Sequence, residues 1–278
     1  MLPGPSFRED IVKNLRAAYA RMWVRLRGGN RDPLSLVAEI ALPILTIGAY
    51  VILYQAIHLP ATAGTAVILG GAMIAFWTNV LWNMSSQWFW EREQGNLEMY
   101  LVAPVSRMSV LLGMALGGSV NTALRALGIV LLGIFVFQVP FQLQDPFSVA
   151  LVFFLTLVAL YTLGMLFASL FMLYGREAWN TANLLQEPVY FLSGAYFPRI
   201  YAPIVPFALQ AAGSLIPMTI GLDAIRRLAI NGDSVVAIWP HILALIVFTL
   251  ILFPLARRTL QYMESLGKKE GRLTLRWQ

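Results

Sequence analysis

The sequence predicts an all-α membrane protein with six transmembrane helices, because its composition is apolar and long apolar runs recur along it. Hydrophobic residues make up 58% of the 278 residues and charged residues only 12%, whereas soluble domains average roughly 45–50% and 25%. A helix needs about 20 apolar residues to cross the ~30 Å hydrocarbon layer of a bilayer. We expect one membrane domain over residues 34–256, with spans at residues 34–57, 65–89, 108–138, 147–174, 180–197 and 235–256.

Residues 1–33 predict a cytoplasmic amphipathic helix that lies on the membrane surface before the first span. Ser6 and Glu9 have the spacing of a capping box, and a Gly-Gly pair ends the segment. Trp23 suits the headgroup level, and basic residues lie between the apolar ones. A helix of a soluble core is the alternative, which the adjoining hydrophobic span disfavours. The apolar residues recur every three or four positions, at Phe7, Ile11, Leu15, Tyr19, Met22 and Leu26.

A charged stretch, residues 91–107, separates the second and third spans and must therefore lie in water. Glu93 and Glu98 precede a short apolar run that Pro104 ends, so we expect a short helix within residues 91–106. Two interpretations follow from the residue types. Either the helix docks its apolar side into another protein at the membrane's edge, or the stretch is an ordinary connecting loop, which the usual lengths of such segments favour.

Between the fifth and sixth spans, residues 198–230 are apolar but too rich in proline and glycine to cross the membrane as one helix. Irregular backbone at membrane depth is tolerated only where protein or a water-lined cavity satisfies its polar groups. We therefore expect a re-entrant helical hairpin on the outer side. In the last part of this hairpin, Asp223, Arg226 and Arg227 give one side a polar character.

The distribution of Lys and Arg predicts that both termini lie in the cytoplasm. Sixteen of these residues fall in segments that we assign to one side, including the basic tail at residues 257–278, and only Arg199, Arg226 and Arg227 fall on the other. Cytoplasmic segments of membrane proteins carry the excess of Lys and Arg. The net charge of +6 therefore indicates contact with anionic membrane lipids and not with nucleic acid.

The sequence lacks the residue patterns of an enzyme or a metal site. It contains no G-x-x-x-x-G-K-[ST] loop, whose backbone amides bind ATP phosphates, and no cysteine. His58 and His241 lack carboxylates at ligand spacing, so we expect both to be interfacial residues. We predict no catalytic residue, metal or cofactor in this chain; ATP, if used, would bind to a partner.

Three charged residues, Glu39, Arg125 and Glu187, fall inside predicted spans, where an isolated charge costs at least about 2.5–3.5 kcal/mol. At 1.5 Å per residue, Arg125 lies about 20 Å from the outer end of its span and Glu187 about 13 Å from the inner end of its own. In a layer of ~30 Å these depths agree within one helical turn. We therefore predict that Arg125 and Glu187 face each other inside the helix bundle, whereas Glu39 lies near a span edge and is solvated.

Polar residues form a stripe on each of two predicted spans. Stripes of this kind hydrogen-bond neighbouring helices or form the wall of a transport path, and the first use is the more common. The residues are Asn79, Asn83 and Ser86 in the second span, and Asn180, Asn183, Glu187, Tyr190 and Gly194 in the fifth.

Two motifs about a hundred residues apart carry a family resemblance. The first is Glu91-Arg92-Glu93-Gln94-Gly95-Asn96-Leu97-Glu98, followed by Leu101, Pro104 and Ser106-Arg107. The second is Phe191-Leu192-Ser193-Gly194-Ala195-Tyr196-Phe197-Pro198, followed by Ile216-Pro217-Met218-Thr219 and Ala224-Ile225-Arg226. They resemble E-R-E-x-G-T-L-E-x-L-x-x-x-P-x-S-R, F-L-S-G-x-F-F-P and N-P-x-T-x-x-x-x-x-x-R of the type-2 permease family of ATP-binding-cassette (ABC) exporters. Asn96 and Ile216 replace the family's usual Thr and Asn, and the resemblance covers nearly the whole chain.

The resemblance implies roles for three sets of residues. A coupling helix that meets the ATPase would contain Glu91, Arg92, Glu93, Gly95, Leu97, Glu98, Leu101 and Pro104. Candidates for the substrate path, which the second and fifth spans line in the family, are Asn79, Asn83, Asn183, Glu187, Tyr190 and Arg125. An outer gate would contain Ser193, Gly194, Phe197, Pro198 and Pro217.

The resulting hypothesis is a permease subunit in the cell membrane of a prokaryote. Two cytoplasmic ABC ATPase subunits, which bind ATP and Mg, and a second permease protomer are the expected partners. The complex would export an amphiphilic, drug-like or lipid-like substrate from the cytoplasm or inner leaflet. Lipid-linked polysaccharide or glycolipid is an alternative cargo, since four tryptophans near the second span could contact sugars, although such residues are often interface anchors. An ATPase-independent channel or membrane scaffold is the rival from another class. The tryptophans are Trp77, Trp82, Trp88 and Trp90.

Overall fold

The computed structural model describes residues 7–29, 33–141, 144–197 and 206–271, and in these ranges the chain is helical without any strand. The predicted all-α class is therefore confirmed for the described residues. The α-helices are α1 (Phe7–Gly29), α2 (Pro33–Ala56), α3 (Ala61–Thr78), α4 (Gln87–Glu93), α5 (Leu97–Val102), α6 (Arg107–Phe135), α7 (Pro146–Leu192), α8 (Phe207–Ser214), α9 (Pro217–Arg226) and α10 (Trp239–Glu270). Two π-helical segments, η1 (Asn79–Met84) and η3 (Arg227–Asn231), extend α3 and α9.

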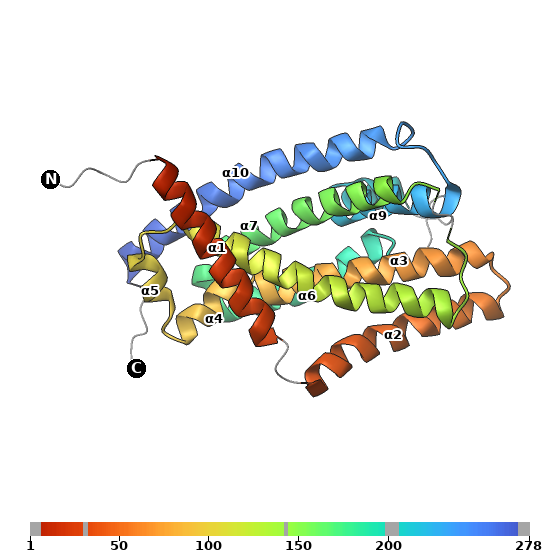
Figure 1. The fold of residues 1–278 in the computed structure, drawn as a ribbon, viewed down its shortest axis with the longest axis horizontal. Coiled ribbons are helices and arrows are strands. Elements are labelled where there is room, and N and C mark those ends of the chain that lie inside the picture. Colours follow the sequence, from red (N-terminus) through yellow and green to blue (C-terminus); the bar gives the residue numbers. More distant parts are fainter. Residues whose placement is uncertain (1–6, 30–32, 142–143, 198–205, 272–278) are drawn as a thin grey trace.

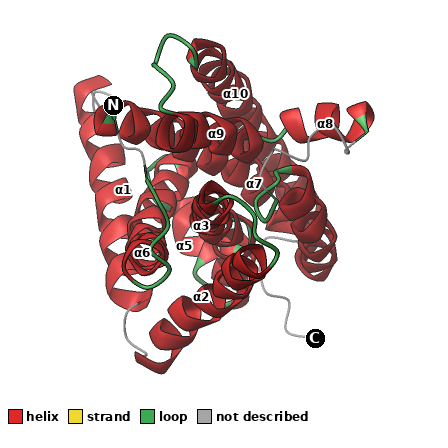
Figure 2. Cartoon of the chain, turned by 90° about the vertical axis from the view of Figure 1, so that its right-hand side faces the viewer, coloured by secondary structure: helices red, strands yellow, loops and turns green. Residues whose placement is uncertain are grey.

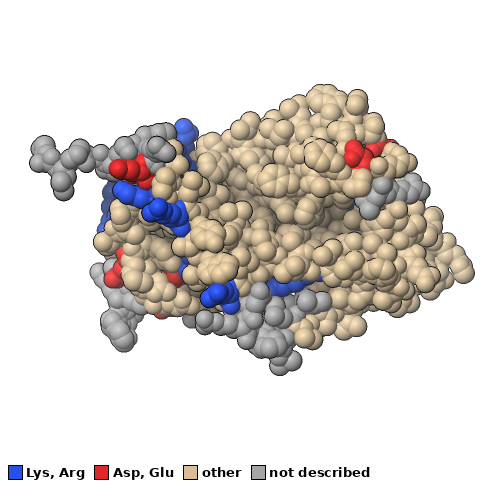
Figure 3. Space-filling view, viewed as in Figure 1, with Lys and Arg blue, Asp and Glu red and all other residues tan. Residues whose placement is uncertain are grey.

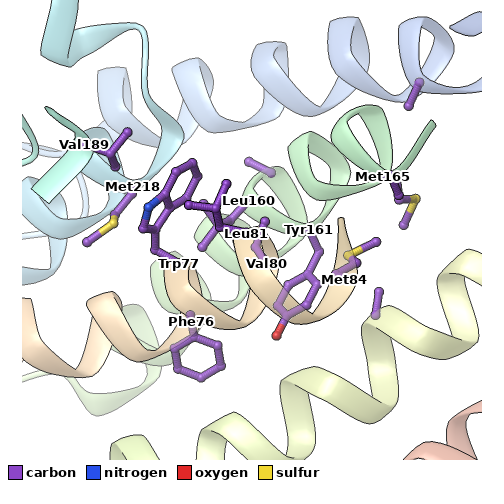
Figure 4. Packing of buried hydrophobic residues seen from close by; sticks show 14 of the residues in the cluster. Phe76, Trp77, Val80, Leu81, Met84, Leu160, Tyr161, Met165, Val189 and Met218 are labelled. Atoms are coloured by element: carbon purple, nitrogen blue, oxygen red, sulfur yellow. The ribbon is translucent and has the colours of Figure 1, made fainter. Parts of the chain in front are cut away.

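The long helices run side by side along the molecule, and α1 crosses them near one end (Figure 1). Viewed along the long axis, α3 lies at the centre, with α2, α6, α7 and α9 around it (Figure 2). Burial agrees with this arrangement. In the most apolar 18-residue stretch of the helix formed by α3, η1 and α4, 78% is buried inside the molecule, whereas 11% is buried in the corresponding stretch of α10. Trp77 of α3, Leu160 of α7 and Met218 of α9 belong to one buried hydrophobic cluster (Figure 4).

Four described helical stretches are long and apolar enough to cross a membrane, and a bent pair formed by α8 with α9 and η3 would make five. Residues Ala41–Ala56 of α2 form a shorter apolar helix. These counts rest on length and composition, so the expected six spans stay a prediction. The four stretches are Ala61–Glu93, Arg107–Phe135, Pro146–Leu173 and Trp239–Glu270.

The predicted fourth and fifth spans both fall within α7, whose backbone is helical from Pro146 to Leu192. The predicted connection between these two spans, residues 175–179, is helical backbone and not a loop, since the residues that follow Gly175 are not helix breakers. The chain nevertheless turns back between Met172 and Gln186. The first part of α7 advances along α3 towards α4, whereas its last part returns, so the two parts pack in opposite directions. Four hydrogen bonds show this. Along α7, Tyr161 Oη donates to Asn79 Oδ1, the Met172 carbonyl oxygen accepts from Arg92 Nη1, Gln186 Oε1 accepts from Trp82 Nε1, and Tyr190 Oη bonds with Thr78 Oγ1.

The helix α1 packs directly on α6 because α6 has glycine where the two helices meet. A Cβ atom added to Gly113 would come within 2.2 Å of the Ala18 carbonyl oxygen, and one added to Gly117 would come within 2.9 Å of the Met22 carbonyl oxygen. The predicted N-terminal helix is present as α1, and its apolar Leu15, Tyr19 and Trp23 are exposed. Such an exposed apolar side is typical of a helix that contacts the membrane surface.

The segment predicted as a re-entrant hairpin contains a sharp bend of 97° between α8 and the helix formed by α9 and η3. Residues 198–205, at its start, lie outside the described residues. On the polar side of its last part, Asp223 and Arg226 are each only 8% exposed. Both are buried because other helices supply their partners, which sequence spacing along α9 does not reveal.

Charged side chains gather at one end of the molecule on the face shown in Figure 3, near α1, α4, α5 and the end of α10. The middle of this face is almost free of charge, and acidic side chains reappear at the opposite end. A long uncharged zone between two charged ends is the pattern expected of a protein that crosses a bilayer.

Candidate coupling site and substrate path

The charged stretch, residues 91–107, contains the end of one helix and the whole of a second. The first, α4, ends at Glu93, and Gly95 follows with a φ of +74°, in the left-handed region that favours glycine. A tight turn then leads into α5, which ends at Val102; Ala103 follows in extended backbone, before Pro104. Gly95, predicted as a coupling residue, thus sets the direction between α4 and α5.

Glu91 is buried, at 3% exposure, and its carboxylate points towards α1. It forms an ion pair with Arg21 of α1 and accepts a hydrogen bond of 3.0 Å from Gln87 Nε2. Arg25, one turn further along α1, donates to Gln87 Oε1 over 3.0 Å. Glu91 was predicted among the residues that meet an ATPase, but in this chain it joins α4 to α1.

Tyr100 of α5 belongs to the same group of contacts. The Arg21 guanidinium lies 5.7 Å from the centre of its ring, and Trp88 makes an edge-to-face contact with the same ring, with 5.7 Å between the ring centres. Burial raises the pKa of the Tyr100 hydroxyl, although the charge of Arg21 acts in the opposite direction. The aromatic ring thus fixes α5 against α4 and α1.

Further polar contacts attach the two ends of this stretch to α1 and α7. Ser106, which precedes α6, donates its backbone N–H to Asn14 Oδ1 of α1 over 2.7 Å. Arg92 Nη1 donates to the Met172 carbonyl oxygen of α7 over 3.3 Å. Movement of the α4–α5 stretch would therefore act on both helices.

Arg107 and Lys268 bind the carboxylate of Glu264, which connects the first residue of α6 to the end of α10. Arg107 Nε lies 3.0 Å from Glu264 Oε2, and Lys268 Nζ lies 2.7 Å from Glu264 Oε1. Burial alone would raise the pKa of Glu264, but the hydrogen bonds from Arg107 and Lys268 outweigh it and hold that pKa below its ordinary value.

The outward face of α5 combines apolar and acidic side chains. Met99 is 66% exposed and Val102 is 86% exposed, and Glu98 and Pro104 are exposed beside them. Leu97 is buried, and Leu101 and Arg92 are half-buried, so these predicted coupling residues support the helices from within. Met99 and Val102, three positions apart, form the apolar centre of this face, which we call the α5 face (Glu98, Met99, Val102 and Pro104).

The candidate path residues divide into two groups. Asn79 and Tyr190 are buried and hydrogen-bond other helices, Asn79 with Tyr161 and Tyr190 with Thr78 over 2.8 Å. The others lie at or near the surface of the single chain: Asn83, Asn183 and Glu187 are exposed, and Arg125 is half-buried on α6.

The pairing of Arg125 with Glu187 stays a prediction. Glu187 lies on the returning part of α7, and its carboxylate accepts a hydrogen bond of 3.3 Å from Gln186.

A cavity of about 240 Å³ opens between α2, α3 and the end of α7. Of the predicted path residues, only Tyr190 lines it. Tyr196, which the path prediction missed, lies beside Tyr190 with its ring stacked on Tyr50, the ring centres 4.8 Å apart. The wall is mainly apolar, and its residues are Leu42, Pro43, Thr46, Ile47, Gly71, Ile74, Thr78, Tyr190 and Tyr196.

The residues assigned to an outer gate lie where α7 ends and α9 begins. Ser193 is buried, Gly194 has a φ of +62°, and Phe197 is exposed. Pro217 is the first residue of α9, the helical position that proline favours. Pro198 lies outside the described residues.

The structure gives His241 a carboxylate partner and changes the expectations for Trp77 and Trp88. His241, expected to be interfacial, has its Nε2 atom 2.9 Å from Asp223 Oδ2, since the fold brings the first turn of α10 against α9. Trp77 and Trp88 are buried in the core, so they are available neither to a sugar nor to the membrane interface. Trp82 is half-buried with its indole N–H on Gln186, and Trp90 is 44% exposed.

Comparison with known proteins agrees with this architecture. Residues 61–258 match the family model described as ABC-2 family transporter protein. The chain is similar to the inner membrane transport permease YadH of Escherichia coli K12, with 30% identity over 195 residues, which cover 69% of this chain and 74% of YadH. The YadH permeases of Escherichia coli O157:H7 and Shigella flexneri match with the same identity and coverage.

Proposed function

Because this chain belongs to the ABC-2 transporter family as a transport permease, we propose that it is the membrane-spanning subunit of an ABC exporter. Membership of the family implies an ABC ATPase partner, which is a separate subunit. The finer proposal is that ATP hydrolysis by two such subunits drives an amphiphilic, drug-like or lipid-like substrate from the cytoplasm or inner leaflet across the inner membrane. Both termini and the α4–α5 stretch would lie in the cytoplasm.

The α5 face is the observation that carries this proposal. An exposed methionine and valine beside a glutamate, on a six-residue helix outside the apolar zone, suit a groove of another protein better than water. The stretch behind this face contacts α1 through Glu91, α7 through Arg92 and α10 through Arg107. A displacement of α5 by the ATPase would therefore reach three helices of the membrane domain by direct contact.

A second permease protomer is part of the proposal because polar side chains remain exposed on the single chain. Asn83, Asn183 and Glu187 are exposed on η1 and the returning part of α7, which pack against each other. A charged or amide side chain at membrane depth normally faces protein or a water-filled cavity and not lipid. Two protomers that meet at this surface would enclose a polar path beside the apolar cavity at Tyr190, as an amphiphilic substrate requires.

The test is co-purification of the ATPase with the membrane-extracted chain, comparing Met99→Lys with Tyr262→Lys. Tyr262 on α10 is 61% exposed, so it is a matched apolar-to-cationic change away from the α5 face. We expect Met99→Lys to lose most of the bound ATPase and Tyr262→Lys to retain it. Export by the purified chain without any ATPase would instead support the channel alternative.

A further inference from the structure

The turn that ends α7 is held by side chains from two other helices. Arg226 of α9 donates from Nη1 to the Gly194 carbonyl oxygen over 2.9 Å and from Nη2 to the Ala195 carbonyl oxygen over 3.1 Å. Tyr54 of α2 donates its hydroxyl to the Tyr196 carbonyl oxygen over 2.7 Å. Three consecutive carbonyl groups are thus bound by side chains that come from distant parts of the sequence.

The same Arg226 guanidinium also binds α3. Its Nε and Nη2 atoms lie 3.2 Å and 2.7 Å from the carbonyl oxygen of Ala66. The residue is only 8% exposed, so these hydrogen bonds form away from water. Carbonyl groups beyond the end of a helix lack intrahelical donors and carry partial negative charge, which a rigid guanidinium with five N–H donors can satisfy.

The backbone around Arg226 is shaped for this contact. A Cβ atom on Gly70 of α3 would lie 1.8 Å from the Ala195 carbonyl oxygen, so only glycine lets the turn rest on α3 at this position. Gly194 adopts a φ of +62°, a conformation that residues with a side chain rarely adopt. Two glycines therefore bring the turn to α3, and Arg226 binds it there.

From these contacts we propose that Arg226, assisted by Tyr54, is the positioning residue that holds the outer gate closed. This inference rests on the proposed function, since the gate role of the turn at residues 193–197 belongs to it. Separation of the turn from α3 requires Arg226 to release either the Ala66 carbonyl or the two carbonyls of the turn. In each case Ser193, which is 5% exposed in this conformation, becomes accessible from the outer side.

Cysteine accessibility tests the proposal, because the chain has no cysteine of its own. Ser193→Cys is introduced into the full chain in membranes, and its modification by a membrane-impermeant maleimide added outside is timed. Removal of several charge-assisted hydrogen bonds by Arg226→Gln should accelerate modification about tenfold or more, and the loss of one neutral hydrogen bond in Tyr54→Phe about threefold. Arg226→Lys, which keeps the charge but not the fork of donors, should give an intermediate rate.

We call the contacts of Arg226 and Tyr54 with the turn at residues 193–197 the latch. Two controls distinguish opening of this latch from destabilisation of the whole fold. Arg227→Gln changes the adjacent, more exposed arginine, whose Nε lies 3.3 Å from Asp223 Oδ2, and should leave the rate of Ser193→Cys unchanged. Ala168→Cys reports on the centre of the bundle, where Ala168 is fully buried, and should stay unmodified with Arg226→Gln. Acceleration at both cysteines would mean that Arg226 only supports the fold, which would overturn the latch.

The remaining outcomes distinguish this inference from the proposed function. Suppose that Ser193→Cys is modified from outside, but at the same rate with Arg226→Gln or Tyr54→Phe as without them. This result would overturn the latch and leave the exporter proposal intact. Should Arg226→Gln fail to insert into the membrane, the Tyr54→Phe rate decides in the same way. Modification of Ser193→Cys only from the cytoplasmic side contradicts the orientation in the proposed function, and the latch with it.

Discussion

Replacement of Glu91 by alanine should destabilise the protein far more than replacement of the neighbouring Glu93. Glu91→Ala leaves the Arg21 guanidinium, only 17% exposed, without its carboxylate. Removal of one partner of a buried ion pair costs about 3–5 kcal/mol. Because Arg21 keeps some access to water, we expect about 2–3 kcal/mol, a figure between that range and the values for surface pairs.

The assay is thermal unfolding of the detergent-extracted chain, with Glu93→Ala as the matched control. For a chain of this size, about 1 kcal/mol corresponds to roughly 2–4 °C in Tm, so Glu91→Ala should lower Tm by about 4–12 °C. Glu93 is 45% exposed and lies 3.5 Å from Arg92, and an exposed pair of this kind contributes at most about 1 kcal/mol.

A double variant separates the ion pair from the loss of packing. Arg21→Met together with Glu91→Ala leaves no uncompensated buried charge, so this chain should be more stable than Glu91→Ala alone. Equal Tm values for Glu91→Ala and Glu93→Ala would refute the assignment of Glu91 as a buried link between α4 and α1. A double variant less stable than Glu91→Ala alone and Arg21→Met alone would refute it as well.

Three further predictions follow from the same contacts. Gly113→Leu should separate α1 from α6, because its Cβ would lie 2.2 Å from the Ala18 carbonyl oxygen. We expect a lower Tm and protease cleavage within α1, and an α1 that resists the protease would contradict this prediction. Glu264→Gln should lower Tm at neutral pH. Since the folded pKa of Glu264 is depressed, its stabilisation is present above the ordinary value of 4.5 and is lost as pH falls through the lower folded value; the Tm difference from the parent should shrink over that range, and a constant difference would refute the charge contribution. Asn83→Leu, at an exposed polar position, should reduce export while ATP hydrolysis continues, and normal export would count against a path at this surface.

The sequence was sufficient for features that depend on composition and local periodicity. The apolar runs predicted the helices of the bundle, and the acidic stretch before Pro104 predicted a short helix, which is present as α5. The amphipathic pattern of the N-terminal segment likewise predicted α1. Each of these features follows from residues close together in the chain.

Features that depend on contacts between distant residues were not accessible in this way. Arg21 and Glu91 are 70 positions apart, and Arg226 and Ala66 are 160 positions apart. The sequence therefore placed Arg226 only on the polar side of its segment, and Glu91 only in a stretch that lies in water. A buried charge is recognised by its partners, and these become known only when the fold brings them together.

Site-specific photo-crosslinking at position 102 tests the central claim most directly. Val102 is 86% exposed at the end of α5, so a photoreactive amino acid there reports what covers the α5 face in the membrane of living cells. The account predicts a crosslink to an ABC ATPase subunit that is lost in Met99→Lys. A crosslink to lipid alone, or access to this position only from the outer side of the membrane, would contradict it.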